Sequence, residues 1–158
     1  MRKLVGIFLL SAVLFSCEEQ FGIESNEVPQ NTIDYSKQLF SGRVLEKSSV
    51  TLDGIAVWKV KIEASSGAIV TFYWQKNYTM LYKIDGEKGP YTYELNPPMD
   101  LIIFSTAKFL AFESYSSETL QSWQLVCDSS QNSIWVYQFF LSEREKPITI
   151  NAKTGDVL

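Results

Sequence analysis

Histidine is absent from the 158 residues of this chain, and cysteine occurs only twice, at Cys17 and Cys127. The lack of histidine excludes Ser-His-Asp and Cys-His catalysis, histidine-ligated zinc and an imidazole pH switch. Basic residues are also few, 14 against 18 acidic ones, which argues against a nucleic-acid partner. Gly-x-Gly-x-x-Gly, Walker A, Cys-x-x-Cys and His-Glu-x-x-His sequences do not occur. The sequence therefore predicts no cofactor, no metal site and no catalytic residues.

Long apolar runs are scarce too, and the one at the N-terminus is the exception. Leu4–Phe15 is apolar apart from two small residues and follows the basic pair Arg2-Lys3. A bilayer-spanning helix needs about 20 residues, so this run is typical of an export signal. It ends in Leu14-Phe15-Ser16-Cys17, which resembles the lipobox of bacterial lipoproteins. The resemblance implies that residues 1–16 are a signal peptide and that Cys17 is lipidated. An ordinary secretory signal, with Cys17 incidental, is the alternative.

A lipidated Cys17 would fasten the protein to a membrane without crossing it. Each buried methylene contributes about 0.8 kcal/mol, and stable anchoring takes two acyl chains. Residues 17–33 are polar and aperiodic, which predicts a flexible linker after the anchor. Glu18-Glu19 is similar to the acidic sorting signals of some Bacteroidetes surface lipoproteins. We therefore expect a location in the bacterial cell envelope, on the periplasmic or surface face of the outer membrane.

The remainder of the chain matches itself at a shift of about 65 residues. This shift places Trp58 on Trp123, and it aligns the apolar residues that follow them. The match predicts two repeated units, residues 34–98 and 99–158, packed as one globular domain. Chance similarity between two β-hairpins is the alternative.

Apolar and polar residues alternate with period two in several segments, which is typical of strands with one buried face. A helix is predicted over Thr106–Phe112 with Ser105 as its cap, and a shorter one within Asp34–Ser41. Together they predict an α+β fold of antiparallel β-sheet meanders with one or two short helices packed on one face. The predicted strands are Trp58–Glu63, Ile69–Trp74, Thr79–Ile84, Ser122–Cys127, Ile134–Leu141 and Ile148–Ile150, with Tyr91–Leu95 as a further candidate.

The end of the chain carries a family resemblance. Ile148–Leu158 is similar to the closing strand and turn of PepSY domains, with Asn151 in the place of their usual aspartate. Gly54–Val60 resembles the tryptophan-led strand of the same unit. The resemblance implies two PepSY-like repeats that bind or restrain other proteins, notably peptidases, without catalytic residues. Tandem copies are similar to β-lactamase-inhibitor-like architectures, in which a concave sheet is the contact surface.

Reactive side chains are predicted to be structural. Cys127 lies in an apolar segment, which predicts a buried, inert thiol rather than a nucleophile. Four carboxylates could be combined into a glycosidase-like acid pair, but solvated turns and strand faces are the favoured positions. They are Asp53, Glu63, Asp85 and Glu87.

The aromatic residues allow two interpretations. Five of them lie at alternate positions of two predicted strands and therefore share one face of the sheet, which predicts a core face under the helix. They are Phe72, Trp74, Trp135, Tyr137 and Phe139. An uncovered face would instead be a protein-binding or sugar-stacking platform. The aromatics expected at the surface are Tyr73, Tyr78, Tyr91 and Tyr93.

The sequence predicts a non-enzymatic, lipid-anchored envelope protein that binds another envelope or extracellular protein. Its contact surface would be a sheet face, a strand edge or the turns. A glycan-binding accessory lipoprotein, which stacks sugars on surface aromatics, is the alternative.

Overall fold

The computed structural model describes residues 27–77, 80–87, 93–98, 100–113, 119–128 and 133–158. The predicted signal peptide, Cys17, Tyr78 and Tyr91 lie outside these residues, as does most of the predicted turn 128–132. The described residues contain two helices and seven strands.

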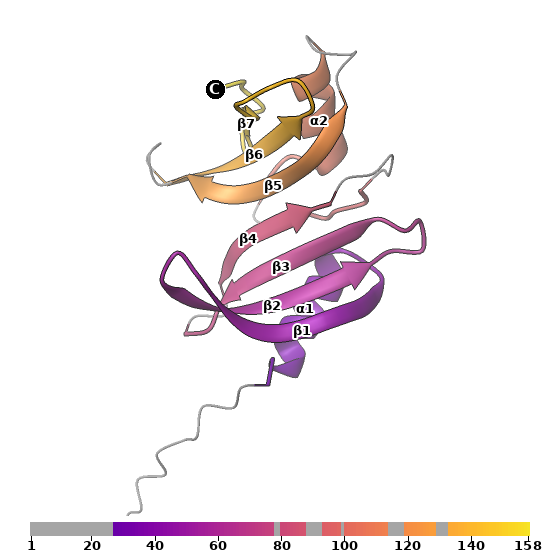
Figure 1. Ribbon diagram of the computed structural model, residues 1–158, viewed down its shortest axis with the longest axis vertical. Coiled ribbons are helices and arrows are strands. Elements are labelled where there is room, and N and C mark those ends of the chain that lie inside the picture. Colours follow the sequence, from indigo (N-terminus) through magenta and orange to yellow (C-terminus); the bar gives the residue numbers. More distant parts are fainter. Residues whose placement is uncertain (1–26, 78–79, 88–92, 99, 114–118, 129–132) are drawn as a thin grey trace, which may run out of the picture.

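All seven strands form one antiparallel sheet in the order β1-β2-β3-β4-β5-β6-β7, so that each strand pairs with its neighbours in the sequence (Figure 1). Helix α1 precedes the sheet, and α2 lies in the connection between β4 and β5. The elements are α1 (Gln30–Leu39), β1 (Arg43–Leu52), β2 (Ile55–Glu63), β3 (Ile69–Gln75), β4 (Leu81–Gly86), α2 (Phe104–Phe112), β5 (Leu120–Asp128), β6 (Ile134–Leu141) and β7 (Ile148–Asn151).

The predicted organisation as two PepSY-like repeats of about 65 residues is wrong. The chain folds as a single continuous sheet, in which β4 pairs with β5 from Lys83 opposite Val126 to Gly86 opposite Trp123. The self-match arose because every strand of an antiparallel sheet repeats the same alternation of buried and exposed residues. Two segments with the same alternation of buried and exposed residues are therefore not necessarily copies of one repeated unit.

The core lies on the face of the sheet that both helices cover. Figure 1 shows α1 behind β1 and β2, and α2 packs against β6 and β7. The predicted aromatic core face is largely confirmed, since Phe72, Tyr137 and Phe139 are fully buried, Trp74 is 7% exposed and Trp135 is partly buried. The Trp74 indole donates a hydrogen bond of 2.9 Å to Ser36 Oγ of α1, whereas the buried Trp123 Nε1 finds no hydrogen-bond partner among the described residues.

Hydrogen bonding also ties α2 to the sheet. The Tyr137 hydroxyl donates to the carbonyl of Ile102 at 2.9 Å, just before α2 begins. Burial of this hydroxyl raises the pKa of Tyr137. The helix begins at Phe104 and has Ile103 as its N-cap without a side-chain hydrogen bond, so the predicted cap at Ser105 is wrong. Packing of Phe104 decides where the helix begins.

Three further predictions need correction. The predicted linker, residues 17–33, runs into α1, where Thr32 and Ile33 are buried. Residues 93–95 form no strand, and Tyr93 is buried at 2% exposure rather than exposed. Cys127 is exposed, because it lies near the end of β5, where α2 no longer covers the sheet.

Strand β1 was not predicted at all. Its charged and apolar residues do not alternate cleanly, and a bulge between Val44 and Glu46 shifts the pattern. It is joined to β2 by the two-residue turn Asp53-Gly54, whose φ angles of 50° and 79° are those of a tight hairpin.

Candidate functional site

One face of the sheet carries neither helix. We name it the open face and define it by the outward side chains of β1 to β6. They alternate with the core residues, as Lys59 and Lys61 do with the buried Trp58, Val60 and Ile62 of β2. The register then brings the outward residues of neighbouring strands side by side. The polar residues of the open face include Glu46, Ser48, Lys59, Lys61, Thr71, Tyr73, Lys83, Asp85, Gln124 and Gln138, with Glu87 just beyond β4.

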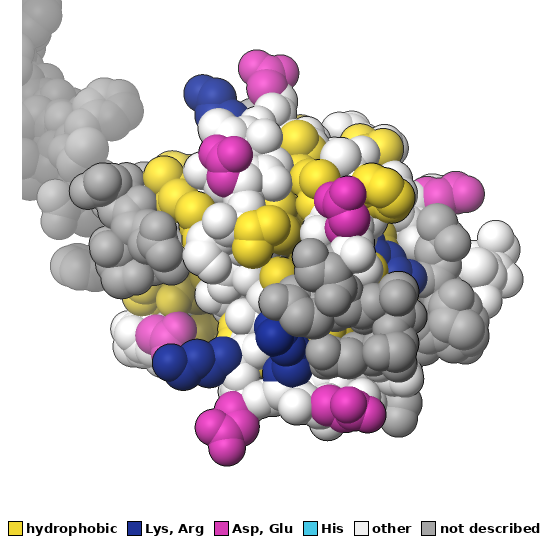
Figure 2. All heavy atoms as spheres, turned by 90° about the horizontal axis from the view of Figure 1, so that it is seen from above, with side chains coloured by type: hydrophobic (Ala, Val, Ile, Leu, Met, Phe, Trp, Pro, Cys, Tyr) yellow, Lys and Arg dark blue, Asp and Glu magenta, His cyan; other side chains and the backbone are white. Residues whose placement is uncertain are grey.

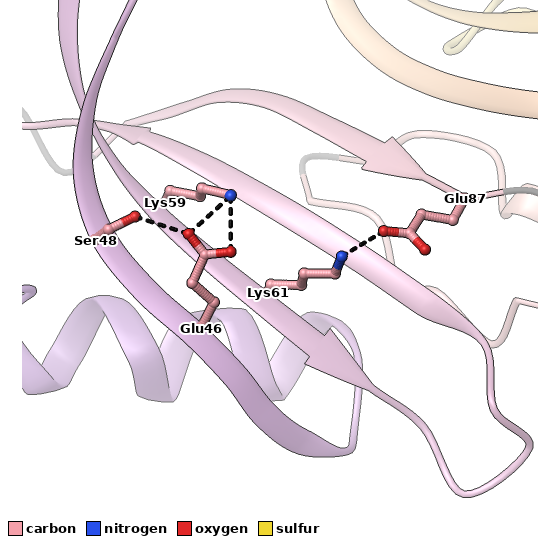
Figure 3. A network of polar contacts seen from close by, with 5 residues as sticks. All are labelled: Glu46, Ser48, Lys59, Lys61 and Glu87. Atoms are coloured by element: carbon pink, nitrogen blue, oxygen red, sulfur yellow. Dashed lines mark hydrogen bonds and ion pairs between the residues drawn. The ribbon is translucent and has the colours of Figure 1, made fainter.

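Ion pairs link the strands across the open face, as Figure 3 shows. Lys59 Nζ lies 2.8 Å from both carboxylate oxygens of Glu46, and Ser48 Oγ donates to Glu46 Oε1 at 3.2 Å. Lys61 forms a second pair with Glu87. The hydrogen bond from Lys59 is the main cause that lowers the pKa of Glu46. The two lysines are only 24% and 26% exposed, so their positions are well defined.

A third cluster lies beside the first two. Lys83 Nζ is 3.0 Å from Asp85 Oδ1, and the Tyr73 hydroxyl lies close enough to the same carboxylate to influence its pKa. Burial raises the pKa of Asp85, and Lys83 and Tyr73 oppose this rise. Burial, followed by the nearby charge of Asp85, raises the pKa of Tyr73 to about 12. Both groups thus lie in a partly dehydrated part of the face.

The raised pKa of Tyr73 predicts a pH effect on stability. Above pH 10 an unfolded chain releases this proton, whereas the folded chain keeps it up to about pH 12. The free energy of unfolding should therefore fall between these values, and less steeply in Tyr73→Phe. Urea unfolding along a pH series measures this slope. Tyr35→Phe, at an exposed tyrosine of α1, is the control, and equal slopes in wild type and Tyr73→Phe would contradict the prediction.

Beyond the charged clusters, the open face becomes less charged. Gln124 of β5 donates to Gln138 of β6, and Val136 beside them is fully buried. A hollow of about 570 Å³ lies at the junction of β4 and β5, and Asp85, Gln124 and Phe140 are among its lining residues. The face therefore combines charges of both signs with a shallow, partly apolar depression.

Asp53, Glu63 and Glu87 lie in a turn or at solvated strand positions, as expected, whereas burial raises the pKa of the fourth predicted carboxylate, Asp85. Asp53 lies in the β1–β2 turn and accepts a hydrogen bond from the Tyr82 hydroxyl at 2.9 Å. Glu63 pairs with Arg43, whereas Asp85 and Glu87 belong to the open face. Each is engaged by a lysine, an arginine or a tyrosine.

Sequence reasoning did not find the lysines of this site. The alternation Lys59-Val60-Lys61 showed that they share a face, but their carboxylate partners come from β1 and from beyond β4. Within the described part of the chain, no group of three histidine, cysteine, aspartate or glutamate residues could hold a metal ion. In that same part, neither helix is long and apolar enough to cross a membrane.

A second exposed surface lies at the end of the molecule that carries α2. Figure 2 looks onto this end and shows hydrophobic side chains gathered there, with carboxylates around them. The exposed apolar residues of α2 and the C-terminus include Ile103 and Phe109, 51% and 68% exposed, together with Val157 and Leu158. This surface is separate from the open face.

Comparisons with known proteins add little to this geometry. No protein-family model and no curated protein matches the chain. Among solved structures, the chain is similar to the crystal structure of a putative lipoprotein from Clostridium difficile 630. The two share 16% sequence identity at a TM-score of 0.37, over 86% of this chain and 93% of that chain. The resemblance to PepSY domains therefore stays a prediction.

Proposed function

We propose that this chain is a non-enzymatic, lipid-anchored bacterial envelope protein that binds another envelope or extracellular protein through the open face. The observation that carries the proposal is a helix-free sheet face on which ion pairs are held in place. The lipobox at Cys17 supports the anchor, and the PepSY-like end of the chain supports protein binding, in particular the regulation of a peptidase.

The charge pattern of the open face favours a folded protein as its partner. Lysines and carboxylates alternate across β1 to β4, so the face has no single sign that would attract a polyanion. Fixed charges of both signs give specificity through complementary charges on a partner. The adjacent hollow at β4 and β5 offers a place for an anchoring side chain.

The side chains of the open face also support a non-catalytic role. Catalysis by carboxylates needs one acid and one base free to reach a substrate. Here Glu46, Glu87 and Asp85 each bind a lysine of the same face. A binding surface, in contrast, can present these ion pairs to a partner without any group being free.

The alternative, a glycan-binding lipoprotein, has less support. Of the aromatics that would stack sugars, Phe72, Tyr137 and Phe139 are fully buried, and Tyr93 is 2% exposed. Tyr73 is half-buried beside Asp85.

Affinity capture tests the proposed surface. Lipidated, tagged full-length chain is incubated with detergent-solubilised envelopes, and retained proteins are identified by mass spectrometry. We expect one envelope protein to be retained by the wild type and lost in the double variant Lys59→Glu/Lys61→Glu, because reversal removes both ion pairs. Lys153→Glu, at an exposed lysine of the C-terminal turn, should retain it. Equal retention by both variants would refute the role of the open face.

The anchor is tested separately through Cys17. We expect Cys17→Ser to move the protein from the membrane fraction to the soluble fraction, because the acyl chains have no other attachment point at the lipobox. Cell fractionation and intact-mass measurement of the mature chain check this. Cys127→Ser is the matched control and should stay with the membrane. An unmodified Cys17 in the wild type would show an ordinary secretory signal instead.

A further inference from the structure

The two edges of the sheet end differently. At β7, the chain covers its own edge, since the backbone of Asn151 donates to Asp156 at 2.8 Å and that of Leu158 donates to Thr149 at 2.9 Å. Val157 also bridges to Ile150. Strand β1, at the other edge, pairs with β2 alone among the described residues. Alternate backbone groups along β1 are therefore available to another strand.

A groove runs along this available edge, between β1 and α1. Its hollow measures about 360 Å³ and is lined by Gln30 and Ile33 of α1 and by four consecutive residues of β1, Val44 to Lys47. Its lining residues make α1 one wall and the edge strand the other, and Figure 1 shows α1 lying behind β1. Edge strands beside a helix are the usual acceptors of an added peptide strand.

The bulge in β1 shapes this groove. Val44 pairs with Ile62 and Glu46 pairs with Lys61, which leaves Leu45 between them without a partner on β2. Leu45 is 41% exposed although it is a large apolar residue, and Ile33 opposite is 6% exposed. The groove thus has an apolar floor that an aliphatic side chain can cover.

Charge distinguishes between possible occupants. Glu46 is bound by Lys59 on the open face, whereas Lys47 forms no ion pair with any described residue. Arg43, at the start of β1, is paired with Glu63 at 2.7 Å, so Lys47 alone supplies the unpaired charge of this edge within the described residues. The free charge along the edge is therefore positive in a chain whose net charge is −4.

We infer that the β1–α1 groove binds an extended segment of another polypeptide as an eighth strand. The segment places an aliphatic side chain against Leu45 and Ile33, and it carries an acidic residue that meets Lys47. Backbone hydrogen bonds to β1 supply affinity, and the groove and Lys47 supply specificity. This site lies on the edge of the sheet and shares Glu46 with the open face.

A phage-displayed library of random dodecapeptides, screened on the purified full-length chain, tests the inference. We expect enrichment of sequences that alternate aliphatic residues and contain Asp or Glu. An enriched peptide should bind Leu45→Lys at least about tenfold more weakly than wild type, because the apolar floor is lost. Phe109→Lys, a matched change at an exposed apolar residue of α2, should bind as wild type does. N-methylation of alternate peptide nitrogens should abolish binding.

Three results would overturn the inference. The first is a screen without enrichment, and the second is equal binding to wild type and Leu45→Lys when both show the same urea unfolding midpoint. The third is concentration-dependent dimerisation by light scattering with NMR shifts on β1, which would make a second copy the occupant. Because Leu45→Lys leaves Lys59 and Lys61 in place, failure of the open face and failure of the groove are distinguishable: capture of an envelope protein reports on the first, and peptide binding on the second.

Discussion

Replacement of Phe104 by alanine is expected to lower the free energy of unfolding by about 3–5 kcal/mol, the usual cost of removing a buried phenylalanine. Phe104 is 1% exposed at the start of α2, and its ring lies 4.6 Å from that of Trp123 and 5.0 Å from that of Tyr93. It also contacts Tyr137 and Phe139 of β6. The variant leaves a cavity between helix and sheet that these rigid rings cannot fill. Urea unfolding measures the loss.

Phe109 of the same helix supplies the control. Its side chain is 68% exposed, so Phe109→Ala should change the free energy of unfolding by no more than about 0.5 kcal/mol. Equal losses in the two variants would show that helix propensity, rather than the aromatic core, sets the stability of α2.

Alanine in place of Gly86 is expected to be the second severe change. A Cβ at Gly86 would lie 1.9 Å from Nε1 and 2.0 Å from Cε2 of Trp123, on the strand paired with β4. Trp123 is 1% exposed and therefore cannot swing away. Overpacking of this kind costs about 1–3 kcal/mol, and here the clash is with a rigid ring. The urea midpoint should drop accordingly.

A double-mutant cycle identifies the cause. In a Trp123→Leu background the indole is gone, so Gly86→Ala should cost much less than it does in the wild type. Gly54→Asn is a useful comparison, because Gly54 has φ 79° and open space around it, and asparagine tolerates this conformation. An unchanged cost of Gly86→Ala in the Trp123→Leu background would assign the effect to the backbone of β4 instead.

The strands that could be predicted from sequence are those in which one face is consistently buried and the other consistently exposed. The bounds of β6 agree with the prediction, and β2, β3, β5 and β7 lie within a few residues of theirs, because core and solvent alternate along each. β1 could not be predicted, since an edge strand is half-solvated on both faces and the bulge at Leu45 breaks the period. The order of the strands in the sheet could not be predicted either, because the alternation of apolar and polar residues indicates which side chains are buried and not which strands are neighbours.

Predictions for single residues were also wrong where the outcome depends on neighbours that are distant in the sequence. Tyr93 was expected at the surface, yet its ring packs edge-on against Phe104 and Trp123 in a connection without regular structure. The open face could be predicted as a set of charged positions, but its ion pairs depend on the register between strands. Glu46 of β1 follows the bulge and stands opposite Lys61 of β2 in the register. From this position its carboxylate reaches the neighbouring Lys59 of β2.

The exposure of Cys127 makes the molecule easy to follow by spectroscopy. In the Cys17→Ser form it is the single thiol of the chain, and it is accessible at the end of β5. One maleimide dye or spin label therefore attaches at one known point, opposite Trp135. Quenching or broadening of that probe gives a direct reading of whatever approaches the β5–β6 end of the sheet.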